Sequence, residues 1–395
     1  MTDKAQLHAQ LVAAARELIP VLKSRAAEAA KLGRLPDETI ADFQKAGFFK
    51  IVQPAKWGGY ELDPQAFFDV QMAVAEGCMS SAWVLGVIAI HNWQLALFDD
   101  RAAQDVWGED ATTLISSSYM PVAKIEVVDG GFNFSGRWGF SSGSKHCDWV
   151  FLGGMIPPAG PGQAPDMRTF LLPKSDYKIV ENWDVMGLQG TGSHDIVVEN
   201  AFVPDYRTHK GVDAFGLSSP GNAVNDGALY KIPFGQIFPR AVSASSIGAL
   251  RGALKDYVDA TAVRVGVNDG KKTKENPTAQ YVIAEVTQIV DELELVLKRD
   301  FERSMAAARG EEEPLSIDER VKMRWNSSLV SERCVAGIGK LMGCAGGSAV
   351  FASHVLNRPF LDINAGRGHV ANNPSNYGRN LGAVELGGAN TDFFI

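Results

Sequence analysis

The chain has 395 residues, 46% of them hydrophobic and 21% charged, which is an ordinary composition for a globular protein with two or three packed units. Its 38 basic and 46 acidic residues give a net charge of −8, and no basic stripe is interleaved with aromatic residues, which argues against nucleic-acid binding and favours a small-molecule partner. The four cysteines, Cys78, Cys147, Cys334 and Cys344, lie far apart, so the sequence predicts neither a disulfide framework nor a metal site and fits a reducing cytoplasm.

The N-terminal part of the chain is predicted to be helical. Apolar residues recur at helical spacing over residues 7–32, and residues 35–38 combine a stop signal with the start of a second helix. Residues 71–98 continue the helical pattern, and residues 99–107 add a short amphipathic helix. We expect no signal peptide and no membrane span, because the chain begins in a polar amphipathic pattern and its longest apolar run, residues 83–90, is far too short.

Around Ile115 the periodicity changes from helical to extended. Residues 125–128, 129–131 and 132–134 predict a strand, a tight turn and a second strand. Further short strands between Gly- and Pro-rich loops are predicted at residues 150–152, 169–172 and 195–198. The middle of the chain is therefore expected to form a small antiparallel β domain.

Helical periodicity returns after Pro239 and continues to the C-terminal end of the sequence. One long apolar stripe consists of Ile283, Val286, Val290, Leu293 and Leu297. Two segments stand outside the pattern, residues 216–227 and residues 269–275. Both are expected to be exposed loops, serving either as plain linkers or as a lid or subunit contact.

These patterns predict an α+β protein built from three parts, with no internal repeat. The expected parts are an N-terminal α-helical domain at residues 1–114, a central β domain at residues 115–225 and a C-terminal helical bundle at residues 226–395.

Three glycine-rich motifs lie along this chain. Residues 136–143 read GRWGFSSG, residues 186–193 read MGLQGTGS with FVP at residues 202–204, and residues 343–347 read GCAGG. Taken singly, such clusters are ordinary turns and helix C-caps. In this order along a helical, β and helical chain, they resemble the acyl-CoA dehydrogenase superfamily, with Gln189 in place of the usual arginine.

This resemblance implies an acyl-CoA dehydrogenase-like fold with a flavin site. Phe140 matches the tryptophan position of the superfamily's flavin loop, and Ser142 matches the residue that presents a hydroxyl to flavin N5. Gly346 and Gly347 match the late turn that lets the backbone approach the dinucleotide of the flavin.

A dinucleotide fingerprint of the GxGxxG type is missing from the sequence, because the glycines of residues 187–192 have the wrong spacing. NAD(P)H is therefore not expected to bind this chain. If the chain uses reduced flavin, we expect a separate NAD(P)H:flavin reductase to supply it.

The place of the superfamily's catalytic glutamate, a short distance after Asp362, holds His369 and Val370. The carboxylate that would remove the α-proton of an acyl-CoA is missing there. This disfavours an acyl-CoA dehydrogenase, which stays open as the alternative enzyme. A flavin-binding homologue without catalytic activity stays open as the alternative that is not an enzyme.

Four longer runs, at residues 90–98, 106–110, 115–119 and 366–373, resemble the oxygenase components of two-component, reduced-flavin-dependent aromatic monooxygenases. The resemblance is closest to the branch that hydroxylates the phenolic ring of seco-steroids and more distant to the 4-hydroxyphenylacetate 3-hydroxylases. It implies a homotetrameric oxidoreductase whose C-terminal bundle provides flavin and subunit contacts. It also implies that reduced FAD or FMN and O2 form a flavin hydroperoxide, which hydroxylates a phenol, a phenolic steroid fragment or an indole-type ring without a metal.

The same resemblance assigns roles to individual residues. It implies catalytic roles for His369, Ser142 and His91. The flavin is implied to contact Ser142, Phe140, Ser117, Ser118, Gly346 and Gly347, and the substrate to contact His91, Ser117, Trp83, Trp93 and Asn373. The chemistry agrees, because a hydroxyl at N5 and a dry cavity would protect the oxygenated flavin, and a histidine can take the proton of a phenol.

Simpler interpretations stay open for these residues. His91, Trp83 and Trp93 could be core residues, and His369 could be an exposed loop histidine. Asn373 stands four residues after His369, where the seco-steroid branch has an aspartate. An amide can orient an imidazole but stabilises its charged form less than a carboxylate does, which favours a substrate without an acidic hydroxyl, such as indole.

Overall fold

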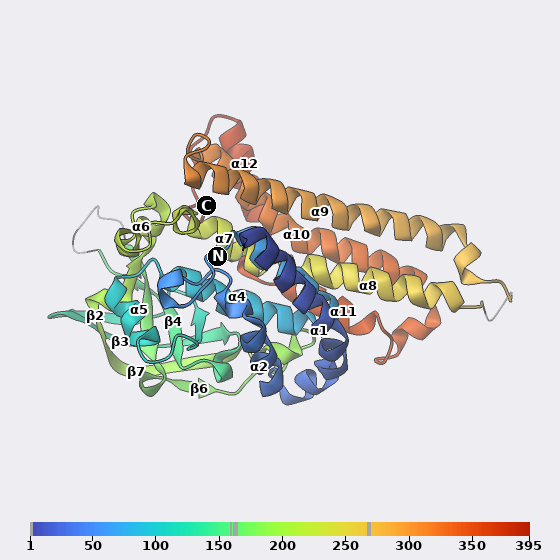
Figure 1. Ribbon diagram of the computed structural model, residues 1–395, viewed down its shortest axis with the longest axis horizontal. Helices are drawn as coiled ribbons and strands as arrows, with labels where there is room; N and C mark the ends of the chain where they lie inside the picture. The colour runs from blue at the N-terminus through green and yellow to red at the C-terminus, as the bar shows by residue number, and fades with distance from the viewer. Residues whose placement is uncertain (1–2, 159, 161–164, 267–269) are drawn as a thin grey trace.

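Figure 1 shows a computed structural model, which describes residues 3–158, 160, 165–266 and 270–395. Helices form the N-terminal part, strands the middle and helices the C-terminal part, as the sequence predicts. The structure confirms the acyl-CoA dehydrogenase-like α+β class. The N-terminal helices are α1 (Lys4–Leu32), α2 (Asp37–Ala46), α3 (Pro64–Gly77), α4 (Met79–Leu95) and α5 (Asp100–Trp107).

The predicted helix over residues 71–98 is two helices. The backbone of Cys78 is extended, with φ −160° and ψ 114°, and this break separates α3 from α4. Every residue of α4 is buried, because α4 runs through the centre of the molecule. A helix that is apolar on all sides is typical of such a position, and the few polar residues it carries need an explanation.

The strands form two four-stranded sheets. One sheet has the order β1 (Ile115–Ser118), β4 (Trp149–Ile156), β5 (Asp166–Pro173) and β8 (Thr208–Lys210), and the other has the order β2 (Lys124–Val128), β3 (Gly131–Ser141), β7 (His194–Pro204) and β6 (Lys178–Val180). The antiparallel prediction is right for every pair of described strands except β1 and β4, which are parallel. The chain visits the second sheet between β1 and β4, and that long excursion is the kind of connection a parallel pair requires.

The two sheets pack face to face. Phe134 and Trp138 of β3 stack on each other and pack with Phe170 of β5 in a shared core. Phe151 of β4 points to the opposite face and packs with Phe98, which follows helix α4. Side chains alternate along a strand, so the first sheet has one face on the second sheet and one face on the helices.

The C-terminal helices are α6 (Gly211–Gly216), α7 (Phe234–Ala241), α8 (Ala244–Val263), α9 (Pro277–Arg309), α10 (Ile317–Cys344), α11 (Asn357–Arg367) and α12 (Pro374–Glu385). The long helices α8, α9 and α10 lie side by side and extend away from the sheets (Figure 1). The predicted apolar stripe on α9 is confirmed, because Val286, Val290, Leu293 and Leu297 are buried and Ile283 packs partly buried against the same core.

The prediction that residues 216–227 form an exposed loop is only partly right, because seven of the twelve residues are exposed and the others are not. Ser219, Gly221 and Asn225 are buried. The N–H of Gly221 donates to the carbonyl of Leu97 at 3.0 Å, and the Asn225 amide donates to the carbonyl of Ala96 at 2.9 Å. This segment therefore closes the carbonyl end of α4. In the other predicted loop, residues 271 and 272 are exposed, whereas Asp269 lies outside the described residues.

Two classes of structure are missing from the described part of the chain. No helix there is long and apolar enough to cross a membrane. No group of three or more His, Cys, Asp or Glu side chains in the same residues is placed to hold a metal ion.

Candidate active site

Ser142 stands directly after the last residue of β3, on a turn that rests against α4. The turn needs two left-handed residues, Phe140 with φ 65° and Gly143 with φ 69°. A Cβ atom on Gly143 would lie 2.8 Å from Ile88 and 2.9 Å from Val84, both on α4, so glycine is required for this close approach. The turn thus places the Ser142 hydroxyl against α4 and leaves Phe140, at 69% exposure, on the surface.

The Ser142 hydroxyl begins a row of buried hydrogen bonds. Trp83 of α4 donates its indole N–H to Ser142 Oγ at 3.2 Å. Ser142 Oγ lies 2.7 Å from Ser193 Oγ, and Ser193 Oγ lies 2.7 Å from Thr191 Oγ1. The Thr191 hydroxyl donates to the carbonyl of Leu188 at 2.9 Å. The row joins two motifs that the sequence places far apart, and it shows functions for Ser193 and Thr191 that the sequence reading did not assign.

Asp362 fixes the far end of this row. Its buried carboxylate accepts the N–H of Leu188 at 2.7 Å. Burial raises the pKa of Asp362 to about 6, against the opposing effects of this hydrogen bond and of Arg358. The Asp362 carboxylate therefore holds the turn in place.

His369 lies next to Trp83, at the start of the short 3₁₀ turn Val370–Asn372. Its ring meets the Trp83 ring edge-on at 5.8 Å and lies 6.4 Å from the Phe238 ring of α7. Nδ1 accepts the N–H of Ala371 at 3.1 Å, so the proton of the neutral ring sits on Nε2. Desolvation, with a smaller effect of the Arg324 guanidinium, lowers the pKa of His369 to about 4. His369 therefore offers an N–H donor at neutral pH.

Asn373 does not pair with His369 in this structure. Its side chain caps α12 by accepting the N–H of Ser375 at 3.1 Å, and the residue is exposed. The orientation of the imidazole comes from the backbone of Ala371, whose carbonyl in turn accepts a hydrogen bond from Arg324 at 2.9 Å. The sequence could not indicate this, because a backbone partner leaves no mark in the residue pattern.

His91 lies on α4 two turns beyond Trp83, about 12 Å along the helix axis. Its Nδ1 donates to the carbonyl of Ile115 at 2.6 Å, so Nε2 is a bare acceptor. That atom is buried and has no hydrogen-bond partner among the described residues. Burial lowers the pKa of His91 to about 4, so the ring is neutral.

Three aromatic rings lie close to His91. The His91 ring lies 5.6 Å from Phe151, 6.2 Å from Tyr119 and 6.5 Å from Phe238. Phe238 thus contacts both His91 and His369, and Trp83 joins His369 to Ser142. The structure therefore brings the three residues of the predicted catalytic set into one continuous aromatic-lined region.

Other predicted residues lie at its margins. Ser117 and Ser118 are buried in β1, and Ser117 pairs in register with Phe151. Trp93 is fully buried, donates its N–H to the carbonyl of Leu229 at 2.9 Å and stacks on Phe234.

Gly346 and Gly347 lie far from this site within the chain. They follow α10, where a Cβ atom on Gly346 would lie 2.2 Å from the guanidinium of Arg264. That end of α10 is away from β3 (Figure 1). The chain does not bring these glycines to Ser142.

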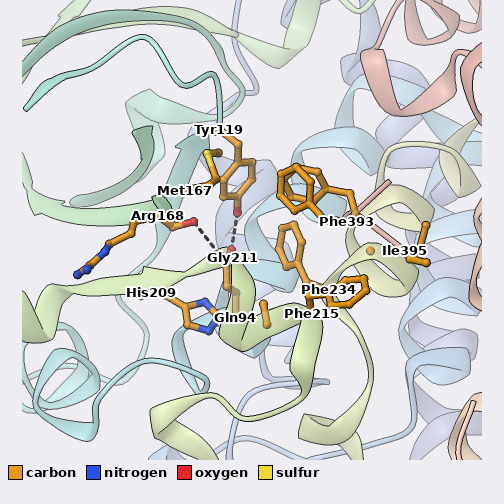
Figure 2. Close-up of a pocket in the computed structure, with 14 residues that line it drawn as sticks. Gln94, Tyr119, Met167, Arg168, His209, Gly211, Phe215, Phe234, Phe393 and Ile395 are labelled. Atoms are coloured by element: carbon orange, nitrogen blue, oxygen red, sulfur yellow. Dashed lines mark hydrogen bonds between the residues drawn. The ribbon is translucent and has the colours of Figure 1, made fainter. Parts of the chain in front are cut away.

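Tyr119 also lines a separate pocket. Figure 2 shows Tyr119 directing its hydroxyl toward Gln94, with Phe234 and Phe393 across the pocket and His209 on another wall. Tyr119 and Phe234 are in contact with each other and with Phe238. Tyr119 lines this pocket and also contacts His91, so the pocket is a neighbour of His91. The sequence did not single out Tyr119 or Phe234.

Acidification should destabilise the fold because of the buried histidines. His91, His209 and His369 have pKa values of about 4 in the folded chain and 6.5 as the ordinary value, so between these pH values the unfolded chain binds more protons. The free energy of unfolding should then fall as the pH drops, by up to about 1.4 kcal/mol per pH unit for each histidine. Asp362, with its pKa raised from 3.8 to about 6, acts in the opposite direction over part of this range and offsets one histidine.

Denaturant unfolding at about pH 7, 6 and 5, values that span the ordinary histidine pKa, measures how the free energy of unfolding changes with pH. The matched variant His91→Phe should have a shallower slope than the wild type. An unfolding free energy independent of pH across this window would contradict the assigned neutral histidines.

Two family models match the chain. The model "Acyl-CoA dehydrogenase, N-terminal domain" matches residues 6–109, and "Acyl-CoA dehydrogenase, C-terminal domain" matches residues 241–374. The flavin-dependent monooxygenase, oxygenase subunit HsaA, of Rhodococcus jostii (strain RHA1) is 38% identical over 96% of this chain and 98% of that protein. The chain belongs to the oxygenase subunits of flavin-dependent monooxygenases.

Further relatives of this oxygenase subunit agree. The oxygenase component of the FADH2-dependent resorcinol hydroxylase of Rhizobium sp. (strain MTP-10005) is 31% identical over 96% of this chain and 95% of that protein. The crystal structure of 3-HSA hydroxylase from Rhodococcus sp. RHA1 superposes with a TM-score of 0.93 at 36% identity, covering 98% of this chain and 99% of that one. The oxygenase subunit is thus a flavin-dependent aromatic monooxygenase with a separate partner component.

The residues at Ser142 fit a flavin in this oxygenase subunit. Ser142 Oγ accepts one hydrogen bond from Trp83 and retains a second lone pair for a ligand. Phe140, two residues before Ser142, is a large apolar side chain left 69% exposed, which leaves an apolar surface for a bound ring to cover.

Proposed function

We propose that this chain hydroxylates a small aromatic compound that carries a hydrogen-bond donor on its ring, with reduced FAD or FMN beside Ser142. The observation that carries this proposal is the bare Nε2 of His91, a fully buried acceptor without a partner among the described residues. An unsatisfied buried acceptor costs about 1–3 kcal/mol. A phenol O–H or an indole N–H would satisfy it.

In this proposal, residues at one end of the site contact the substrate, and residues at the other end contact the flavin. His91 accepts the hydrogen of the substrate, and His369 offers its Nε2–H toward the space between the substrate and the flavin. Trp83 positions Ser142, and the rings of Tyr119 and Phe238 exclude water. Reduced flavin, when bound, supplies the activation of O2.

Relatives name both substrate chemistries. One is called a resorcinol hydroxylase, and another, 28% identical over 66% of this chain, is called an indole-3-acetate monooxygenase. Both compound classes present a ring donor, which is what His91 would recognise. Asn373 caps α12 and does not bond to His369, so its amide gives no preference for indole over a phenol.

The direct test supplies reduced flavin and 18O2 to the purified chain with a panel of phenols and indoles. We expect 18O in the product of at least one compound with a ring O–H or N–H, and little reaction with its O- or N-methylated form. Hydroxylation of methylated and free forms at equal rates would remove His91 from substrate recognition.

Ser142→Ala should uncouple flavin use from product formation. The loss of one hydrogen bond, worth about 1 kcal/mol, should weaken reduced-flavin binding about five-fold and raise hydrogen peroxide release up to about ten-fold. Peroxide and product formed per reduced flavin are the quantities to measure. Unchanged coupling would remove Ser142 from the flavin site.

Acyl-CoA thioesters should not reduce flavin bound to this chain. The family's carboxylate position holds His369, and the nearby Asp362 accepts the N–H of Leu188. Anaerobic addition of saturated acyl-CoA thioesters of several chain lengths to the oxidised-flavin complex should leave its absorbance unchanged. Bleaching by any of them would favour the acyl-CoA dehydrogenase alternative.

We assign the separate partner component as an NAD(P)H:flavin reductase that binds transiently, and the chain as a cytoplasmic homotetramer. The sequence has no GxGxxG fingerprint, and its four cysteines are unpaired, as is usual in a reducing compartment. Exposed Val350 and Phe351, just after Gly346 and Gly347, favour a subunit contact at the end of α10. Gly346 and Gly347 would then contact the flavin of a neighbouring subunit, and light scattering of the purified chain tests the tetramer.

A further inference from the structure

The row of hydroxyls formed by Ser142, Ser193 and Thr191 has a preferred direction. We propose that this row makes Ser142 a hydrogen-bond acceptor toward the flavin and thereby favours the reduced over the oxidised form. Ser193 and Thr191 would be positioning residues that act through Ser142. The inference rests on the proposed place of the flavin beside Ser142.

The direction follows from counting protons, since each hydroxyl has one to donate. The Thr191 hydroxyl donates to the carbonyl of Leu188 at 2.9 Å, because a carbonyl can only accept. Thr191 must then accept from Ser193, and Ser193 must accept from Ser142, each at 2.7 Å. The indole N–H of Trp83 donates to Ser142 at 3.2 Å. The proton of Ser142 therefore points away from the ligand side, where a lone pair is left.

The reverse direction is less favourable without a ligand. If Thr191 donated to Ser193 and Ser193 to Ser142, the proton of Ser142 would have no protein acceptor among the described residues. The hydrogen bond from the Thr191 hydroxyl to Leu188 would also be lost, although this carbonyl would keep the indole N–H of Trp183 at 3.0 Å and the backbone N–H of Thr191 at 3.1 Å. The forward row is thus preferred by one net hydrogen bond.

The Leu188 carbonyl is a fixed end for the row. Leu188 has a left-handed backbone, with φ 55°, and its N–H donates to the buried Asp362 at 2.7 Å. A Cβ atom on Gly187 would lie 2.2 Å from the carbonyl oxygen of Leu361, so the turn is packed directly on the backbone of α11. The acceptor that orients Thr191 therefore cannot turn aside easily.

The two redox states of a flavin differ at N5 in the relevant way. Reduced flavin carries a hydrogen on N5 and can donate to Ser142, whereas oxidised flavin has a bare lone pair there and needs a donor. Oxidised flavin can bond to Ser142 only if the row reverses. One net hydrogen bond corresponds to a preference of about five-fold for the reduced form. For a two-electron couple, at about 30 mV per ten-fold, this is about 20 mV in the midpoint potential of the bound flavin.

The test compares dissociation constants of reduced and oxidised flavin, measured anaerobically, for the wild type, Ser193→Ala and Thr191→Val. Ser193→Ala removes the acceptor of the Ser142 proton, and Thr191→Val removes the group that fixes the direction. In both variants Ser142 becomes free to donate, so the preference for reduced flavin should shrink about five-fold, mainly through tighter binding of the oxidised form. Thr191→Ser keeps the hydroxyl and should retain the wild-type ratio.

A spectroscopic readout reports the same contact directly. With flavin labelled by 15N at N5, the oxidised complexes of Ser193→Ala and Thr191→Val should show an N5 resonance shifted toward the hydrogen-bonded position, relative to the wild type. The two variants alter different positions, so misfolding of one leaves the other to decide.

Ser142→Ala separates this inference from the placement of the flavin. Suppose Ser142→Ala weakens the binding of reduced flavin, while Ser193→Ala and Thr191→Val keep the wild-type ratio of the two dissociation constants. The directional row is then overturned, and the placement of the flavin at Ser142 stands. If Ser142→Ala changes the affinity of neither redox state, the flavin does not sit at Ser142, and both proposals fail.

Discussion

His91→Phe should slow hydroxylation of a phenol by up to about 10²-fold, because losing the acceptor of a buried donor costs about 1–3 kcal/mol. The donation from Nδ1 to the carbonyl of Ile115 leaves Nε2 as a bare acceptor, and phenylalanine supplies none. The pKa of about 4 means that His91 is neutral at pH 7 and acts as a hydrogen-bond acceptor, because burial disfavours its protonated form. Rapid-quench measurement of product after mixing reduced flavin, O2 and substrate gives the rate.

A matched control for His91→Phe is His146→Phe. His146 is also a buried histidine with its pKa lowered to about 4 and with Nε2 unpartnered among the described residues, but it lies near Asp37 of α2 and outside the aromatic region. It should keep the wild-type rate and the wild-type preference for a phenol over its methyl ether. If His91→Phe also kept that preference, His91 would not recognise the ring donor.

His369→Ala should likewise reduce product formation by about 10²-fold while O2 is still consumed and hydrogen peroxide is released. The structure gives His369 an N–H donor at Nε2, next to Trp83 and so to Ser142, which places its action toward the flavin end of the substrate. Because the pKa is about 4, the rate should show no histidine titration near pH 6.5. Product and peroxide yields should be measured from about pH 5.5 to 8, a range that spans the ordinary histidine pKa. They test both the loss of product and the absence of a histidine titration.

Asn373→Asp is the control for His369→Ala. Asparagine and aspartate cap helices about equally well, and this side chain caps α12. The substitution should therefore leave rates for phenols and indoles within about two-fold of the wild type. A selective gain for phenols would indicate that residue 373 reaches His369 after all, and would restore the sequence-based expectation of a pair.

The fold was largely predictable because its signals are local. The periodicity of residues 7–32 and the apolar stripe of α9 each report one buried helix face, and the strand, turn and strand at residues 125–134 give the hairpin of β2 and β3. The failures have a common cause. Residues 216–227 look like an exposed loop by composition, but hydrogen bonds to Ala96 and Leu97, distant in sequence, bury part of this segment.

The sequence also singled out Ser142, His91 and His369 through family-like motifs, and the structure links them through Trp83 and Phe238. Their roles stay predictions. Tyr119 and Phe238 were not recognised as walls of the site, because a lone aromatic residue has no periodic or spacing signal of its own. Trp93 stacks on Phe234, and its expected contact with the substrate stays a prediction.

The sequence by itself determined which chemical groups are available: two histidines, a serine at a glycine-rich turn and the helices that can bury them. Tertiary structure alone decided what each group can do. The carbonyl of Ile115 makes His91 an acceptor, the N–H of Ala371 makes His369 a donor, and Ser193 turns the proton of Ser142 away from the ligand. The physical reason is that a tautomer or a hydroxyl direction depends on the partner within hydrogen-bond reach, and for His91 and Ser142 that partner comes from another part of the chain.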